Sequence, residues 1–276
     1  MARRIIIGVL VTVALLGLAR RLTVGKPVDL EVERGGVRAS HRTVTRHVGP
    51  GAPVIDVRVR PAEGAIVSGV FGDPRTDEFG SLAFERSDEE GLFQAALPEL
   101  PKGSRVRYAV TVAAPGGEPI RFPERPGAFV LLKYKGKASP VVLAAHIACM
   151  FGGFFCMVMS LFGAIRILRG REGKAGAVRF ARWALLLSFI GGWPLGFVLN
   201  RETFGTLWEG YPFGYDVTDN KTQLMFIFWL ASLLLVRGSF LGRNESADTL
   251  PAKGFAWAIV TSFVVSLVLF VLPHSI

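Results

Sequence analysis

Long apolar runs are the feature that most constrains this chain. Residues 140–165 contain no Asp, Glu, Lys or Arg and exceed the roughly 20 residues that a helix needs to cross a bilayer. Three further runs lie at about residues 183–199, 222–242 and 255–272, and the 222–242 run reaches its full length only if Arg237 snorkels to the headgroups. We therefore predict a four-helix transmembrane bundle over residues 138–276.

A fifth apolar run, residues 5–19, lies between two pairs of arginines and permits two interpretations. Its charged start and apolar middle are typical of a secretory signal. However, the following Leu-Gly-Leu-Ala-Arg-Arg provides no small-x-small cleavage site. We therefore expect residues 1–21 to be an uncleaved membrane anchor, with a cleaved signal as the alternative.

The segment between the first two runs, residues 27–137, shows the alternation of strands instead. Polar and apolar residues alternate over 54–60 and again over 105–112. Shorter candidate strands, separated by Gly/Pro turn signals, are 28–32, 43–48, 65–71, 81–86, 92–96, 119–122 and 129–134. Seven to nine strands at this spacing predict an all-β, two-sheet sandwich.

The run from Leu97 to Val110 resembles the corner and following strand of fibronectin type III and related immunoglobulin-like domains. In that family a tyrosine at the place of Tyr108 bonds back to upstream backbone. The resemblance covers about 100 residues and implies a spacer or binding module. It implies no specific activity, because fold alone does not give function.

The distribution of charge predicts topology rather than nucleic-acid binding. The net charge is +10, yet residues 27–137 are nearly balanced and most of the excess lies beside the spans. The 166–182 loop is strongly basic, whereas acids outnumber bases in the 200–221 loop. By the positive-inside rule the N-terminus is cytoplasmic, and the sandwich and C-terminus are extracytoplasmic, in a bacterial inner membrane.

Cysteine and histidine are scarce. The two cysteines, Cys149 and Cys156, both fall in the 140–165 run, so no disulfide can form within residues 27–137. His41 and His47 would share a face of one unbroken strand, but no third ligand is nearby. We expect them to be surface histidines, with a metal pair as the alternative.

The helix predicted at 140–165 carries a small residue at every fourth position, which lets helix backbones approach closely in lipid. The positions of this stripe are Ala148, Gly152, Cys156, Ser160 and Ala164. Packing within the chain's own bundle is the favoured interpretation, and a docking face for a partner subunit is the alternative.

His146, Cys149 and Met150, joined by Met157, can also share a face of this helix. Imidazole and sulfur would suit Cu(I) or haem iron, and ionisable groups inside a membrane are functional candidates. No other span has a central histidine, so we predict no cofactor. A redox or metal-handling membrane protein stays open as the alternative function.

The loop over residues 200–222 is the densest constellation of glycine, proline, aromatic and charged residues in the chain. The candidate ligand or partner residues are Trp208, Glu209, Tyr211, Asp216, Asp219, Asn220 and Lys221. Four of these, the three acids and Asn220, could offer oxygen ligands to Ca²⁺. A structured, ion-paired loop is the favoured interpretation, ahead of a ligand or partner site and of catalysis.

The run Trp208 to Thr222, with the pattern WxGxPFGxDxTDNKT, also resembles a loop in uncharacterised bacterial multi-pass membrane proteins of similar layout. That resemblance covers the four C-terminal spans and implies architecture only.

No Ser-His-Asp, Cys-His or P-loop pattern is present, which favours a protein that is not an enzyme. The leading hypothesis is a non-enzymatic component of a bacterial envelope assembly, with the sandwich and the 200–222 loop as binding surface for a protein partner. A transporter is disfavoured because the spans hold almost no charge.

Overall fold

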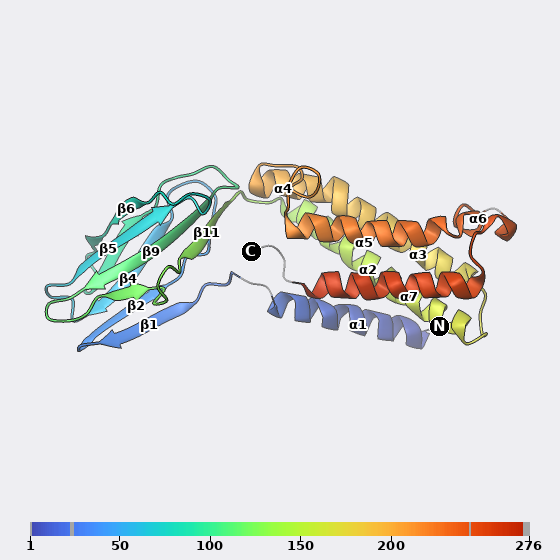
Figure 1. Cartoon of the computed structure of the whole chain (residues 1–276), viewed down its shortest axis with the longest axis horizontal. Coiled ribbons are helices and arrows are strands. Elements are labelled where there is room, and N and C mark those ends of the chain that lie inside the picture. The colour runs from blue at the N-terminus through green and yellow to red at the C-terminus, as the bar shows by residue number, and fades with distance from the viewer. Residues whose placement is uncertain (1, 23–24, 243, 273–276) are drawn as a thin grey trace. The chain divides into compact units, whose positions relative to one another are not determined.

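The computed structural model describes residues 2–22, 25–242 and 244–272, and it combines β sheets with helices (Figure 1). The chain divides into two compact units. A β unit comprises residues 25–137 together with 202–205, and a helical unit comprises the described residues of 1–24, 138–201 and 206–276. The predicted combination of β sheets with several helices is confirmed.

The β unit contains two sheets, in which all strand pairs are antiparallel except β3–β11. The first sheet has the order β1 (Asp29–Arg34), β2 (Val37–Arg42), β4 (Val54–Arg60), β8 (Leu92–Ala96), β7 (Glu85–Arg86). The second has the order β3 (Arg46–Val48), β11 (Val130–Lys135), β9 (Arg105–Ala113), β5 (Ile66–Gly72), β6 (Gly80–Ala83), with β10 (Ile120–Phe122) paired to β9.

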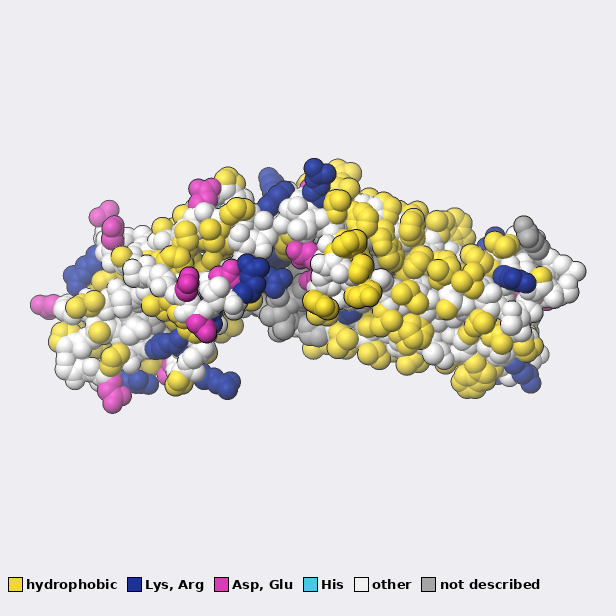
Figure 2. Space-filling model, turned by 45° about the horizontal axis from the view of Figure 1, so that its top comes forward, with side chains coloured by type: hydrophobic (Ala, Val, Ile, Leu, Met, Phe, Trp, Pro, Cys, Tyr) yellow, Lys and Arg dark blue, Asp and Glu magenta, His cyan; other side chains and the backbone are white. Residues whose placement is uncertain are grey.

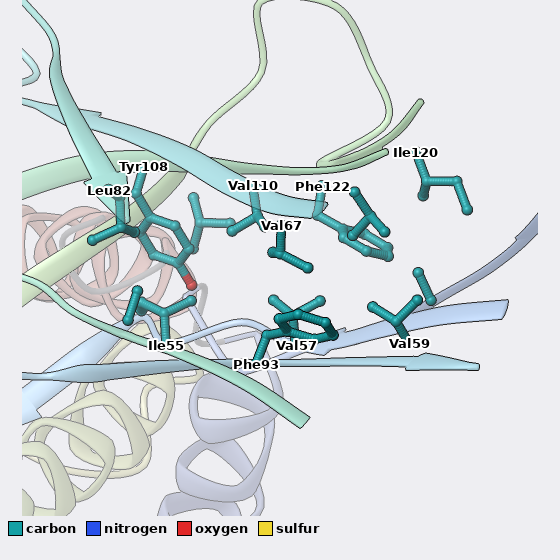
Figure 3. Packing of buried hydrophobic residues seen from close by; sticks show 14 of the residues in the cluster. Ile55, Val57, Val59, Val67, Leu82, Phe93, Tyr108, Val110, Ile120 and Phe122 are labelled. Atoms are coloured by element: carbon teal, nitrogen blue, oxygen red, sulfur yellow. The ribbon is translucent and has the colours of Figure 1, made fainter. Parts of the chain in front are cut away.

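The core of the β unit follows from the alternation in β4. Ile55, Val57 and Val59 are fully buried, while the residues between them are exposed. Val110 of β9 and Phe122 of β10 meet them from the other sheet (Figure 3). Burial of each such side chain contributes about 1.5–3 kcal/mol, so these contacts hold the two sheets together.

One strand, β2, was missing from the sequence prediction. Gly35 and Gly36 both adopt positive φ and form a two-residue hairpin turn, in which Arg34 pairs with Val37. Glycine adopts this conformation without steric cost, so the turn joins two strands of the same sheet. The Gly-Gly pair was the signal that could have found β2.

The predicted surface placement of His41 is wrong, since the residue is only 2% exposed. Its Nδ1 lies 2.8 Å from the Asp56 carbonyl oxygen, and its Nε2 lies 3.1 Å from the Tyr108 hydroxyl. That hydroxyl accepts from the Val44 amide at 2.8 Å, so its proton is directed to the histidine. Burial lowers the pKa of His41 and raises that of Tyr108.

The alternative prediction, a metal pair of His41 and His47, is also wrong, because the two residues do not belong to one unbroken strand. His41 belongs to β2 of the first sheet, and His47 belongs to β3 of the second. Tyr108 does bond to upstream backbone, as the fibronectin-like resemblance implied, but its partner Val44 lies in the segment between those two strands.

Three helical segments of the helical unit are long and apolar enough to cross a membrane. They are α2 (Pro140–Leu168), the continuous segment Ala175–Phe204, and α7 (Ala252–Val271). Two further helices, α1 (Ala2–Arg21) and α5 (Val217–Leu234), run beside them (Figure 1). Hydrophobic side chains cover most of the visible face of these helices (Figure 2), as expected of a surface that meets lipid.

The continuous segment Ala175–Phe204 crosses Pro194 without ending. It consists of α3 (Ala175–Ile190), a π-helical turn at Gly191–Leu195, and α4 (Gly196–Phe204). Proline cannot donate to the preceding turn, and a widened turn accommodates the missing bond. Pro194 therefore lies in a π-helical turn within one longer helical segment.

The helix predicted over residues 222–242 does not extend over the last eight of them. The helix α5 ends at Leu234, and a separate short helix, α6 (Arg237–Phe240), follows. The Leu235 carbonyl accepts from the Thr249 and Leu250 amides, so the returning chain takes the position of the next helical turn. Arg237 therefore does not extend the apolar segment.

The stripe of small residues lies partly inside the bundle. Leu187 of α3 approaches the position that a Gly152 side chain would take, and the Ser160 hydroxyl donates to the Ala177 carbonyl at 3.0 Å. Cys156 and Ala164 are buried, whereas Ala148 is exposed. At Gly152 and Ser160 the stripe packs against the chain's own α3.

Candidate functional site

The loop that precedes α5 is held by side chains of its own C-terminal end. Asp216 caps the helix by accepting from the Thr218 and Asp219 amides at 2.8 and 3.1 Å. The carboxylate of Asp219 is buried and accepts from the Glu209 amide at 2.7 Å and from the Asn200 side chain at 3.2 Å. Asp219 therefore fastens the loop to both neighbouring helices, α4 and α5.

Asn220 and Trp208 fix the remainder of the loop. The Asn220 side-chain oxygen accepts from the Tyr211 amide at 2.7 Å. The Trp208 ring stacks on Trp193 of the π-helical turn, with ring centroids 5.9 Å apart, and meets Phe197 edge to face. These aromatic contacts stabilise the loop beyond the area that they bury.

Three aromatic side chains project from this fixed loop. Tyr211, Phe213 and Tyr215 are 65%, 84% and 90% exposed. We call these three residues the aromatic tip. Large apolar side chains are rarely left this exposed on a rigid segment unless they meet lipid or another protein.

The carboxylates of this loop do not form a cation site in the part of the chain that the structure describes. The oxygens of Asp216 and Asp219 accept from amide groups. Nowhere in residues 2–22, 25–242 and 244–272 do three His, Cys, Asp or Glu side chains lie close enough to share a metal ion. The hypothesis of a Ca²⁺ site therefore finds no ligand set here.

A cavity of about 320 Å³ opens between α2, α5 and α7. Most of its wall is apolar, and its polar groups are His146, Lys221, Thr218 and Thr222. The apolar lining residues are Leu143, Ile147, Met150, Phe151, Met225, Leu269 and Phe270. This cavity combines a buried cation with a hydrophobic wall, the usual composition of a small-molecule site.

The two basic side chains of this cavity are each anchored to a backbone carbonyl. His146 Nδ1 lies 2.9 Å from the Gly191 oxygen in the π-helical turn, so Nδ1 carries the proton and donates. Lys221 Nζ donates to the Leu272 oxygen, just after the end of α7, at 2.8 Å. A neutral His146 then presents the lone pair of Nε2.

The three side chains of the candidate metal group all contact one residue, Gly191, in the π-helical turn between α3 and α4. They are His146, Cys149 and Met150. Met150 and Cys149 pack against Gly191, the residue whose carbonyl oxygen His146 contacts. No sequence pattern had connected these three side chains with the π-helical turn. A role for them in binding copper or haem stays an untested alternative to the prediction of no cofactor.

A second polar cluster lies between the α2–α3 loop and the segment before α7. Lys174 pairs with Asp248, and the Ser239 amide and hydroxyl donate to the same carboxylate at 2.8 and 2.5 Å. Burial by itself would raise the pKa of Asp248, but the bonds from Lys174 and Ser239 outweigh it and lower that pKa to about 2. We call these three residues the clasp.

Comparison with known proteins adds no family. No protein-family model matches the chain, and no curated protein matches it.

Sequence reasoning missed two associations that the structure makes. It treated Lys174 only as a topology signal and did not single out Asp248 or Ser239. It also considered His146 and Lys221 separately, although each lies near the start of its helix, α2 or α5, and both line one cavity. The signal in the sequence was that both residues lie at a similar distance from the start of their helices.

Proposed function

We propose that this chain is a non-enzymatic integral component of a bacterial inner-membrane assembly, which binds a protein partner through the aromatic tip. The observation that carries the proposal is the exposure of Tyr211, Phe213 and Tyr215 on a loop fastened by Asp219 and Asn220. Aromatic side chains on a rigid support lose little conformational entropy on binding and dominate the energetics of interfaces.

The proposal assigns an immunoglobulin-like sandwich to the β unit and a bundle with five crossings to the helical unit. The shared core of its two sheets supports the first assignment. The second counts α1 and α5 as crossings beside the three candidate spans, because Gly8 of α1 lies against Phe155 of α2 and α5 packs on α7 through Trp229 and Ser266. With five crossings and a basic 166–182 loop inside, the N-terminus is cytoplasmic and the β unit is extracytoplasmic.

Cysteine accessibility tests this topology. In a chain whose Cys149 and Cys156 are replaced by alanine, Glu118→Cys and Arg171→Cys each introduce one exposed thiol. We expect a membrane-impermeant maleimide to label position 118 in intact spheroplasts and position 171 only after the membrane is opened. Labelling of position 171 alone in intact spheroplasts would reverse the orientation.

Photo-crosslinking tests the partner site. A photoreactive phenylalanine analogue replaces Phe213 or, as a matched control, Trp257, which is 61% exposed on α7. We expect position 213 to crosslink to another protein and position 257 to lipid. Phe213→Ser should reduce the partner recovered in mild detergent about tenfold, the effect of losing one interface hot spot.

Two outcomes would contradict the proposal. Crosslinks from position 213 to lipid alone would assign the tip to the headgroup region of the bilayer. Equal partner recovery with Phe213→Ser and Trp257→Ser would show that the tip does not hold the partner.

A further inference from the structure

We propose that the cavity between α2, α5 and α7 binds a single-chain amphiphile with an acidic head, such as a fatty acid. The carboxylate would lie beside Lys221 and the chain along the apolar wall. This site is separate from the aromatic tip, and the inference does not depend on the proposed function.

The polar groups of the cavity point to an anion. Lys221 is the cation of the lining, is 8% exposed, and lies in the second turn of α5. Thr218 and Thr222, one turn apart on the same helix, also line the cavity, and the Thr222 hydroxyl donates to the Thr218 carbonyl at 3.0 Å. A charge-assisted hydrogen bond to a carboxylate is about twice as strong as a neutral one, and strongest where water is excluded.

The remaining wall suits an aliphatic chain. From the second turn of α5 the cavity continues to Met225, and along α2 from Leu143 to Phe151. Methionine and leucine side chains adapt to a flexible apolar ligand without specific hydrogen bonds. The ligand would thus place its head near the ends of the helices and its chain deeper among them.

The volume of the cavity favours a ligand with one acyl chain over a whole phospholipid. About 320 Å³ is at the lower limit of small-molecule pockets, which range over roughly 300–1,000 Å³. One acyl chain fits this space, whereas the two chains and head of a phospholipid do not.

Photoaffinity labelling of the full chain in nanodiscs tests the inference. The probes are diazirine-bearing dodecanoic acid and the matching alcohol, which differ only in the head. We expect the acid to label peptides of α2, α5 and α7 at this cavity about tenfold more than the alcohol. Excess unlabelled dodecanoic acid should abolish that labelling, and excess anionic phospholipid should not.

Two variants and their matched controls sharpen the test. Lys221→Gln removes the cation, and Lys253→Gln makes the same change at an exposed position outside the lining. Met225→Trp fills the cavity, and Val264→Trp adds the same bulk at an exposed position of α7. We expect only the first member of each pair to lower labelling by the acid, again about tenfold.

Equal labelling by acid and alcohol would overturn the inference, because it would indicate simple partition of the chain into the bilayer. Labelled peptides outside the cavity would overturn it too. Displacement by anionic phospholipid rather than by dodecanoic acid would assign the cavity to membrane lipid. These outcomes are measured on the unaltered chain, so they hold even if a variant fails to fold.

Discussion

The β unit and the helical unit pack their interiors by different means. Large aliphatic and aromatic side chains fill the β unit, and its buried polar pair, His41–Tyr108, is bonded internally. In the helical unit serine hydroxyls bridge the helices, as in Ser232–Ser262 and Trp229–Ser266, both at 2.9 Å. In water, apolar burial stabilises a fold, whereas in lipid close contact and interhelical hydrogen bonds must do so.

The largest effect expected from this difference comes from truncating one buried phenylalanine in each unit. Phe122→Ala in the β unit should cost about 3–5 kcal/mol, because both the transfer energy and the packing are lost. Phe154→Ala in the helical unit should cost about 1–2 kcal/mol, because lipid is as apolar as the protein interior and only packing is lost.

Hydrogen exchange followed through a denaturant series, with the chain in nanodiscs, reports on each unit separately. Equal losses at the two positions would show that the helical unit is stabilised by apolar burial after all.

Close helix contact provides the second comparison. A Cβ added at Gly163 would lie 2.9 Å from Ala177 Cβ and 3.1 Å from its Cα, so α2 and α3 would have to separate. We expect Gly163→Ala to destabilise the helical unit by about 1–3 kcal/mol, as overpacking does. Gly176→Ala, where nothing lies within 4 Å, is the control and should be neutral or stabilising. Equal behaviour of the two variants would argue against close α2–α3 contact.

The two units should also respond to acid in different pH windows. Burial holds the pKa of His41 below its ordinary 6.5, so the unfolded β unit binds a proton that the folded one does not. Stability of the β unit should fall as pH decreases below about 6.5, by up to about 1.4 kcal/mol per pH unit. His41→Gln should remove this slope, and a slope that persists would assign it to another group.

The clasp of the helical unit should stay closed over the pH range in which the β unit loses stability. The pKa of Asp248 is lowered from 3.8 to about 2, so its contribution is complete above pH 3.8 and is lost between 3.8 and 2. Opening of the α6 segment, followed by hydrogen exchange, should therefore begin well below the pH at which the β unit weakens. Opening of both at the same pH would contradict this assignment.

Periodicity and length predicted most of the fold. Strands β4 and β8 begin and end where the alternation placed them, and α2 begins at Pro140 as expected. The span over 222–242 failed because tertiary bonds from Thr249 and Leu250 to the Leu235 carbonyl end the helix early. No local pattern records a partner that lies fourteen or fifteen residues away along the chain.

The candidate sites were predictable only in part. The dense loop was visible in the sequence, because unusual residues gather there, but its helix cap, Asp216, was considered only as a ligand or partner residue. The cavity was not visible, since His146 and Lys221 are far apart in sequence and each has an ordinary interpretation alone. Only the packing of α2, α5 and α7 brings them to one wall.

The smallest effect on stability is expected at the aromatic tip, which belongs to neither core. Phe213 is 84% exposed, so Phe213→Ser should change the unfolding free energy of both units by less than about 0.5 kcal/mol. The same hydrogen-exchange series, on chain purified without a partner, measures it. A loss above about 1 kcal/mol would mean that Phe213 already packs on the chain or on lipid. A negligible loss together with reduced partner recovery would separate binding from folding at this position.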